Sequence, residues 1–184
     1  MPTSRSAGGV SAARRLRRAP VRRAEGRFLV EGPQAVGAAA AAGLLLEAFA
    51  TADAAAGLDL GVPVTVVGDR ALASLADTVT PQGLVGVAAT VDRPLAEALA
   101  GRPYLVLVLL DARDPGNAGT AIRTADAAGA DAVVLARGPE GGSVDIHGGK
   151  AVRASAGSIF HVPVATGTWP EVLTSLRGAG LRVR

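Results

Sequence analysis

Several polar side chains follow a short apolar run in the middle of the chain, and their types could bind a charged or polar ligand. Among them are Asp111, Arg113, Asp114, Asn117, Arg123, Thr124 and Asp126. Asn117 and Arg123 lie six residues apart, so a helix that begins near Asn117 can hold both close to one loop. The alternative is a helix cap at Asn117 and a solvated arginine.

The elements around these residues predict where they stand. Residues 104–110 (YLVLVLL) form an apolar run typical of a strand buried on both faces. The stretch 111–117 contains Pro and Gly and ends in Asn117, which can cap a helix over 118–128. Gly129 ends that helix, and 132–135 is a second apolar run. This βαβ unit predicts a parallel sheet with the loop at the carboxyl end of the first strand, where open α/β sheets bind ligands.

The stretch 114–129 (DPGNAGTAIRTADAAG) resembles the first motif of the SpoU (TrmH-type) RNA ribose 2′-O-methyltransferases, members of the SPOUT superfamily. The residues in register are Pro115, Asn117, Gly119, Arg123, Thr124, Ala125 and Gly129. No G-x-G-x-x-G follows the strand, which disfavours a dinucleotide-dependent oxidoreductase.

Composition limits the other classes. The chain has 184 residues, five of them aromatic, which suits one large or two small domains with a core of Ala, Val and Leu. There is no cysteine, and the two histidines, His147 and His161, are too scattered for a metal site, so we expect no metal. The sequence has no run of 18 apolar residues, so it predicts no membrane span, and no secretory signal is evident. We expect a cytoplasmic protein without a membrane partner.

Charge is concentrated at the N-terminus. Residues 1–27 hold eight arginines and one acid, a net charge of +7, whereas the rest holds 11 basic and 15 acidic residues, a net charge of −4. Such a segment indicates a polyanionic partner, or alternatively a solvated tail. The arginines that we expect to contact RNA phosphates are Arg14, Arg15, Arg17, Arg18, Arg22, Arg23 and Arg27.

The N-terminal half predicts a small α/β domain. We expect helices over 10–23 (limited by Pro20), 34–42 and 70–76, and strands over 27–30, 44–50, 62–67 and 83–90. This order, with the stretches 27–32 (RFLVEG) and 80–87 (TPQGLVGV), resembles the substrate-binding domain of many SpoU enzymes. We expect domain boundaries at 1–92 and 104–184, with a proline-flanked linker over 93–103.

After the central unit, the chain predicts a glycine-rich loop over 137–150, a helix over 150–156, a strand over 159–164, a helix over 169–177 and the start of a strand over 181–184. Lys150 and Arg153 share a helix face and could contact phosphate, or form a solvated pair. His147 is expected in a loop, His161 in a structural strand position, and Glu31 in a capping or folding role.

The resemblance implies an α/β fold: a small RNA-binding domain followed by an incomplete parallel-sheet SPOUT domain of the knotted, Rossmann-like kind. It implies methyl transfer from S-adenosylmethionine to a ribose 2′-hydroxyl of rRNA or tRNA, with Arg123 and Asn117 as site residues, and a homodimer when complete. The family's two later cofactor motifs do not occur in 150–184. We therefore expect the cofactor residues beyond Arg184; the alternative is a non-catalytic RNA-binding protein of the same family.

Overall fold

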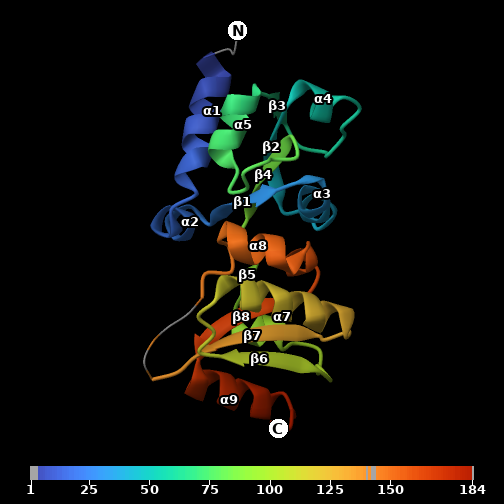
Figure 1. The fold of residues 1–184 in the computed structure, drawn as a ribbon. Coiled ribbons are helices and arrows are strands. Elements are labelled where there is room, and N and C mark those ends of the chain that lie inside the picture. The colour runs from blue at the N-terminus through green and yellow to red at the C-terminus, as the bar shows by residue number, and fades with distance from the viewer. Residues whose placement is uncertain (1–3, 140, 142–143, 184) are drawn as a thin grey trace.

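The computed structural model describes residues 4–139, 141 and 144–183, with side chains from Ala7 onward. It contains two four-stranded sheets, each with its own helices, stacked along the long axis of the molecule (Figure 1). The first sheet and its helices come from residues 4–89, and the second sheet and its helices from residues 92–178. We call these the first and second units. No helix among the described residues is long and apolar enough to cross a membrane.

The first unit is a mixed sheet with helices on both faces. Its elements are α1 (Ser4–Arg15), α2 (Ala19–Glu25), β1 (Arg27–Glu31), α3 (Pro33–Ala41), β2 (Leu45–Ala50), α4 (Ala52–Ala55), β3 (Val64–Val66), α5 (Asp69–Leu75) and β4 (Leu84–Ala89). The strand order is β1-β4-β2-β3, with β4 antiparallel to both neighbours and β3 parallel to β2.

The basic N-terminal segment folds as two helices instead of one. Pro20 lies in the first turn of α2, where its missing N–H costs nothing, so it begins a helix after a break at residues 16–18. Gly26 then adopts φ +62° and its N–H bonds the carbonyl of Arg22. This left-handed position ends α2 and turns the chain into β1.

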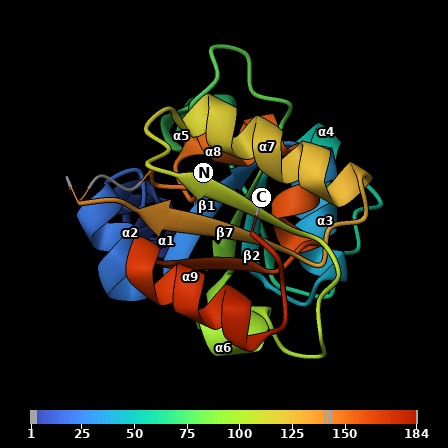
Figure 2. The ribbon, with the colours of Figure 1, turned by 90° about the horizontal axis from the view of Figure 1, so that it is seen from below.

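The second unit has an all-parallel sheet of order β5-β8-β7-β6. Its elements are β5 (Asp92–Arg93), α6 (Leu95–Ala98), β6 (Val106–Leu110), α7 (Pro115–Ala127), β7 (Ala132–Arg137), α8 (Gly149–Ser155), the 3-10 helix η1 (Ser158–Phe160), β8 (Val164–Thr168) and α9 (Trp169–Gly178). Helices α7 and α8 cover the face toward the first unit, and α6 and α9 cover the other face (Figure 1, Figure 2). The predicted α/β class with a parallel sheet is confirmed.

The prediction that 104–110 is a strand buried on both faces is wrong. Tyr104 and Leu105 precede β6 and are 93% and 42% exposed, and Leu110 is 53% exposed. The reason is position: within the described residues, β6 pairs only with β7, so it is an edge strand. An apolar run therefore predicted a strand but not its place in the sheet.

The expected linker over 93–103 is not a free connection. Arg93 is part of β5, which pairs with β8, and α6 buries Ala98 against the second sheet together with Leu99. The prolines at 94 and 103 flank this short element, but its apolar side chains give it a place in the core of the second unit.

Two strands predicted near the C-terminus are also wrong. Residues 158–160 form η1, which starts after Gly157 at φ +94°, and the strand begins only at Val164, after Pro163. Residues 181–183 have no regular structure, and Arg184 lies outside the described residues.

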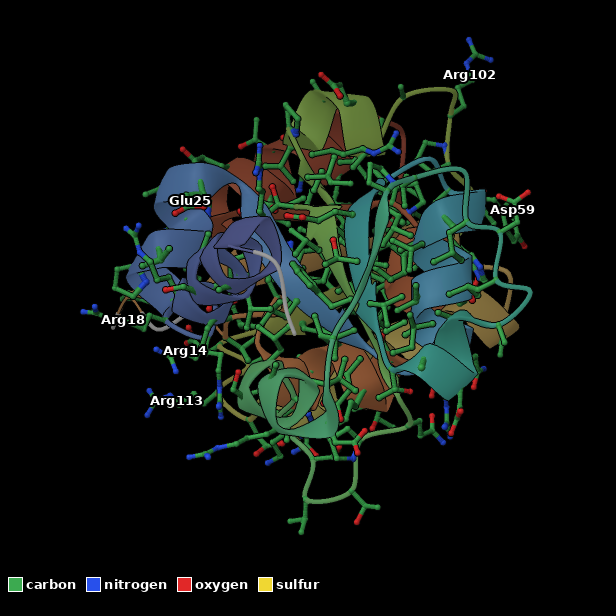
Figure 3. All side chains as sticks on the ribbon, turned by 90° about the horizontal axis from the view of Figure 1, so that it is seen from above. Arg14, Arg18, Glu25, Asp59, Arg102 and Arg113 are labelled. Carbon is green, nitrogen blue, oxygen red and sulfur yellow. The ribbon has the colours of Figure 1, made fainter. Side chains whose placement is uncertain are left out.

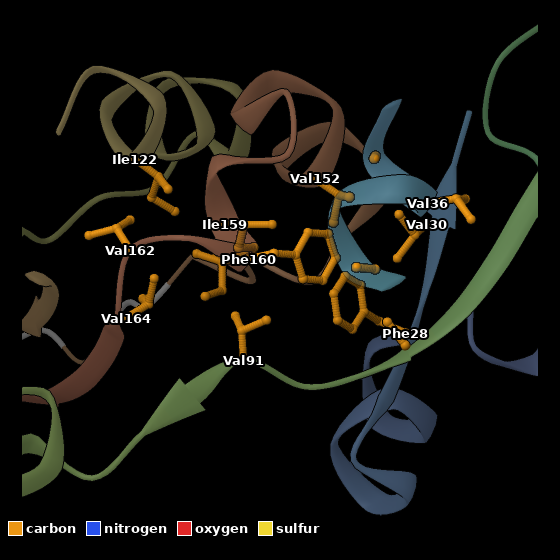
Figure 4. Close-up of a cluster of buried hydrophobic side chains, with 14 of the residues drawn as sticks. Phe28, Val30, Val36, Val91, Ile122, Val152, Ile159, Phe160, Val162 and Val164 are labelled. Atoms are coloured by element: carbon orange, nitrogen blue, oxygen red, sulfur yellow. The ribbon is translucent and has the colours of Figure 1, made fainter. Parts of the chain in front are cut away.

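One apolar core runs through both units. Phe28 on β1 stacks on Phe160 of η1 with ring centroids 5.9 Å apart, and Val30, Val36 and Val152 surround the pair (Figure 4). The same cluster continues to Ile122 on α7 and on to the second sheet. Burial of this continuous cluster couples the positions of the two units.

Candidate functional site

The loop after β6 is fastened to the neighbouring strand by Asp111. Its backbone N–H donates to the carbonyl of Ala136 at 2.9 Å, and its carboxylate accepts the N–H of Gly138 at 2.6 Å. Asp111 has φ +50°, a left-handed conformation that is uncommon outside glycine. A side chain at Gly138 would collide with the Asp111 carboxylate. The carboxyl ends of β6 and β7 are therefore held together at one edge.

Asp114, not Asn117, caps the central helix. The Asp114 Oδ1 accepts the N–H of Asn117 at 2.8 Å, and Pro115 occupies the first turn of α7. Lys150 Nζ donates to Asp114 Oδ2 at 2.6 Å. That hydrogen bond, followed by the one from Asn117, holds the pKa of Asp114 below its ordinary value. The prediction of Asn117 as cap is wrong because the helix begins at Pro115, three residues earlier than expected, which leaves the Asn117 side chain exposed.

Arg123 lies in the third turn of α7. Six residues separate it from Asn117, which places the two about 9 Å apart along the axis and about 120° apart around it. Both side chains are exposed, and Arg123 has no hydrogen bond or ion pair with any residue that the structure describes. The guanidinium is thus available to a ligand. The same helix buries Ala118, Ile122 and Ala125 in the core.

Gly119 lets α7 and α8 approach closely. A Cβ at this position would lie 2.3 Å from the carbonyl oxygen of Ala151 and 2.7 Å from the Ala154 Cβ. The contact sets α8 against the middle of α7 and brings Lys150 to the loop. One glycine of the quoted motif therefore has a packing role, not a ligand role.

The two basic residues of α8 have intramolecular partners. Lys150 pairs with Asp114, as above, and Arg153 Nη1 lies 3.5 Å from Asp77 and 3.7 Å from Glu31. Both basic side chains are partly exposed, so these pairs are screened by solvent. Their predicted phosphate contacts remain a proposal that requires exchange of these partners.

The N-terminal arginines separate into two groups. Arg14, Arg15, Arg18, Arg23 and Arg27 are exposed and form no ion pair with other described residues. Arg17 is also exposed but pairs with Asp77 at 3.2 Å. Arg14 and Arg18 project from the same side of the molecule as Arg113, away from Arg102 (Figure 3). This side carries the carboxyl ends of the second sheet (Figure 1).

Arg22 does not belong to the solvent-facing set. It is 8% exposed, and its Nη1 donates to the carbonyls of Leu16 and Arg17, both at 2.8 Å. Its Nη2 pairs with Asp145 of the second unit at 2.7 Å. The expectation that Arg22 contacts phosphate is corrected: burial and these three partners make it a tie between the units.

His147 also lies where the two units meet, a region that we call the junction. Its Nε2 accepts the N–H of Val91 at 3.2 Å, and its ring centroid lies 4.8 Å from that of Phe28. Burial lowers the pKa of His147, although Asp92 and Asp145 nearby act in the opposite direction. Asp92 Oδ1 also lies 3.2 Å from Nε2, which would favour a proton there, but Asp92 is 42% exposed and therefore screened, whereas the hydrogen bond from Val91 requires a lone pair on Nε2. The neutral form is favoured, which fits a structural role.

The other two residues considered in the sequence also have defined partners. Glu31 accepts hydrogen bonds from the backbone N–H groups of Asp77 and Thr78 and from the Thr78 hydroxyl, which confirms a folding role. His161 is not in a strand: it follows η1, is exposed, and its Nδ1 lies 3.2 Å from Asp126 on α7.

Two family models match the chain. That of the SpoU rRNA Methylase family covers residues 104–184, and that of the MRM3-like substrate binding domain covers residues 9–86. The chain belongs to the SpoU family. Within this SpoU chain, the loop at 111–117, α7 and α8 all lie in the first of these matches.

Relatives of this SpoU chain are rRNA methyltransferases. The 23S rRNA (guanosine(2553)-2′-O)-methyltransferase RlmP of Bacillus subtilis is 38% identical over 127 residues, covering 68% of this chain and 47% of that protein. Mouse mitochondrial rRNA methyltransferase 3 is 33% identical over 167 residues, covering 83% and 38%. The match thus spans about half the length of RlmP and a smaller share of the mouse protein.

A solved structure shares the fold. The AdoMet-bound rRNA methyltransferase from Sinorhizobium meliloti superposes with a TM-score of 0.79 at 28% identity, covering 97% of this chain and 68% of that one.

Sequence reasoning missed Asp77, Asp92 and Asp145, the carboxylates at the junction, because their partners are distant in sequence. The cap at Asp114 did have a signal, an Asp immediately before a proline at a helix start.

Proposed function

We propose that this chain is the RNA-binding and ribose-positioning part of an rRNA 2′-O-methyltransferase. The observation that carries the proposal is Arg123, an exposed guanidinium without a partner among the described residues. It lies on α7, which follows the carboxyl ends of the parallel strands, the edge where open α/β sheets bind ligands and which we call the ligand edge. Family membership and the named activities of the relatives support the reaction class.

In this proposal, the residues of α7 hold the acceptor nucleotide. Arg123 orients the phosphate next to the target ribose and stabilises negative charge on its 2′-oxygen, because a guanidinium donates up to five hydrogen bonds and stays charged. The Asn117 amide hydrogen-bonds the ribose. Arg14, Arg15, Arg17, Arg18, Arg23 and Arg27, with Lys150 and Arg153, bind phosphates without reading sequence.

S-adenosylmethionine is the proposed methyl donor, supported by the cofactor-bound Sinorhizobium meliloti structure. Cofactor sites bury most of their ligand. At the carboxyl edge of this sheet, the described residues Arg137, Gly138, Thr168 and Trp169 line only an open groove, and Leu110 is exposed. These residues do not form an enclosed cofactor site by themselves, so no catalytic step is assigned through the cofactor.

Homodimerisation of the whole protein and a cytoplasmic location are part of the proposal. The bacterial rRNA methyltransferase relative supports the location, although relatives named as mitochondrial also match. The exposed apolar edge at Tyr104, Leu105 and Leu110 offers an area that an oligomer could cover.

The test is methyl transfer from labelled S-adenosylmethionine to rRNA by the complete gene product. Arg123→Ala should lower the rate at least about tenfold, because one transition-state donor is lost. Arg177→Ala, on the far helix α9, is the charge-matched control and should leave it unchanged. A rate equal to that of wild type for Arg123→Ala refutes the assignment.

The same methyl-transfer assay also tests the second candidate function, a non-catalytic RNA-binding protein of the same family. The open groove at the carboxyl edge favours it for the 184 residues taken alone. Calorimetry of this chain with S-adenosylmethionine should then show no tight binding, while RNA still binds. RNA affinity that does not fall as salt is raised would remove the arginines from the interface.

A further inference from the structure

A groove lies between α1 and the β3–α5 turn, on the end of the first unit away from the second sheet. It encloses about 820 Å³. The apolar part is made by Val10 of α1 and by Val66 and Ala71, with Val66 56% exposed. Helices α1 and α5 run side by side there (Figure 1). The groove therefore offers an apolar floor that a ligand with an apolar face can cover.

The rim of the groove is cationic. Arg14 of α1 and Arg70 of α5 both line it, both are exposed, and neither pairs with another residue in the described part of the chain. Ser11 and Ser74 add hydroxyl groups, and the Ser74 hydroxyl donates to the carbonyl of Ala71, which leaves its lone pairs free to accept. Asp69 adjoins the groove on α5 but does not line it.

We propose that this groove binds an unpaired nucleotide of the RNA substrate. The base packs on Val66 and Val10, and Arg14 and Arg70 hold the flanking phosphates. An unstacked base presents an apolar face together with polar edges, and arginine planes also stack on bases. The inference rests on the proposed function, since it assumes that the substrate is RNA.

Charge favours RNA over the other occupants of such a groove. Both lining residues that carry charge are arginines, and six further arginines occur in the first 27 residues other than Arg14 and Arg5. A second copy of this chain would bring the same positive groove against its own basic helices. RNA instead supplies one negative charge per nucleotide. The exposed Arg14 and Arg18 extend this surface along the side of the molecule that carries Arg113 (Figure 3).

An RNA strand seated in the groove would therefore run past α1 and α2 toward the ligand edge of the second sheet. The groove and the loop at 111–117 belong to different units, but the shared core around Phe28 and Phe160 fixes their relative position. The nucleotide in the groove is then a second contact point at a fixed distance from the nucleotide proposed to be methylated. A single-stranded segment next to the methylated site is the expected substrate feature.

The decisive variant is Arg70→Ala, measured by fluorescence anisotropy of the full 184-residue chain. The probes are a short labelled single-stranded RNA and a duplex of the same sequence. Affinity for the single strand should fall about fivefold, and the plot of log affinity against log salt should become shallower by about 0.7, the loss of one phosphate contact. Duplex binding should change less, because a paired base cannot enter the groove.

Arg177→Ala on α9 removes the same charge at the far end of the molecule and is the matched control. If Arg70→Ala and Arg177→Ala bind the single strand equally, the groove proposal is overturned while RNA binding stands. If the wild-type chain binds neither RNA, the proposed function itself fails.

Photo-crosslinking locates the base independently of affinity. RNA that carries 4-thiouridine should crosslink to peptides that contain Val10 or Val66. Val66→Glu should abolish that crosslink, because a carboxylate on the floor repels phosphate and hydrates the base pocket. A Val66→Glu chain with unchanged crosslinking but altered oligomeric state in size-exclusion chromatography would identify a protein partner and contradict the proposal.

Discussion

Arg22 differs from the neighbouring arginines in its surroundings and not in its chemistry. Only 8% of it is exposed, and it reaches from α2 to Asp145 in the second unit. Its Nε is buried without a hydrogen-bond partner in the described structure. Most donors of this buried guanidinium are satisfied and one is not. Removing the guanidinium alone is costly, because its carboxylate partner then loses its counter-charge.

We predict that Arg22→Ala lowers the free energy of unfolding by about 3 kcal/mol, the low end for a broken buried pair because Asp145 is partly hydrated. Urea unfolding followed by circular dichroism measures this. Arg23→Ala, one residue away and exposed, should change stability by no more than about 0.5 kcal/mol. Equal losses for the two variants would mean that the Arg22–Asp145 tie does not stabilise the fold.

His147 gives the junction a pH dependence of known sign. Its folded-state pKa lies below the ordinary value of 6.5 because burial disfavours the charged ring. Above about pH 6.5 both states are neutral, and the group has no effect on stability. As the pH falls from there toward the lowered folded pKa, the unfolded state takes up the proton first, so the free energy of unfolding decreases.

The prediction is a smaller loss of stability between pH 7.5 and pH 5.5 in His147→Gln than in wild type. Glutamine can still accept the N–H of Val91 but does not titrate. Urea midpoints at the two pH values measure the difference. His161→Gln is the control, because that ring is exposed beside Asp126. If wild type and His147→Gln lose the same stability, the depressed pKa of His147 does not contribute.

At the scale of elements, the crossing of α7 and α8 depends on the missing side chain of Gly119. Ala at this position would bring its Cβ within 2.3 Å of a backbone oxygen, which cannot move without shifting α8. Gly37, inside α3, has open space around it. The two glycines thus separate packing from helix propensity.

Gly119→Ala should destabilise the protein by about 2–3 kcal/mol, the usual cost of overpacking. It should also displace Lys150 from Asp114. Gly37→Ala should stabilise by about 0.5–1 kcal/mol, because alanine is the better helix former. Thermal unfolding of both variants tests this pair of opposite signs. A Gly119→Ala protein as stable as wild type would show that α8 tolerates the shift.

Sequence periodicity located most elements but not their neighbours. The runs at β2, β4 and β7 and the faces of α3, α5 and α9 follow from local pattern, because apolar spacing reports burial. The same apolar signal at 104–110 could not distinguish a central strand from the edge strand β6. At 158–160 the left-handed Gly157 starts a 3-10 turn where alternation indicated a strand.

The candidate site was predictable only in part. The motif located Asn117 and Arg123, whose roles stay proposals, but the local pattern placed the start of the helix three residues too late because the cap is Asp114. Arg22 and Arg153 could not be sorted from the solvated arginines, since their partners Asp145 and Asp77 lie 123 and 76 residues away in sequence. Such pairs are set by the docking of whole units.

At the scale of the whole molecule, the two units share one core and are tied by Arg22 and Asp145. Phe28 of the first unit is fully buried against Phe160 of the second. Phe49, which is 1% exposed, lies in a separate apolar cluster that is formed only by residues of the first unit. The junction therefore predicts a single cooperative unfolding transition instead of two.

Trp169, the sole tryptophan, reports on this coupling because it begins α9 in the second unit. Phe28→Ala should lower the free energy of unfolding by about 3–4 kcal/mol. It should shift the Trp169 fluorescence transition and the circular dichroism transition together, although Phe28 lies in the other unit. Phe49→Ala should shift both as well if folding is fully cooperative. A Trp169 transition that stays in place while the circular dichroism signal splits would mean that the units fold independently, and that the distance between the arginine-rich helices and α7 is not fixed.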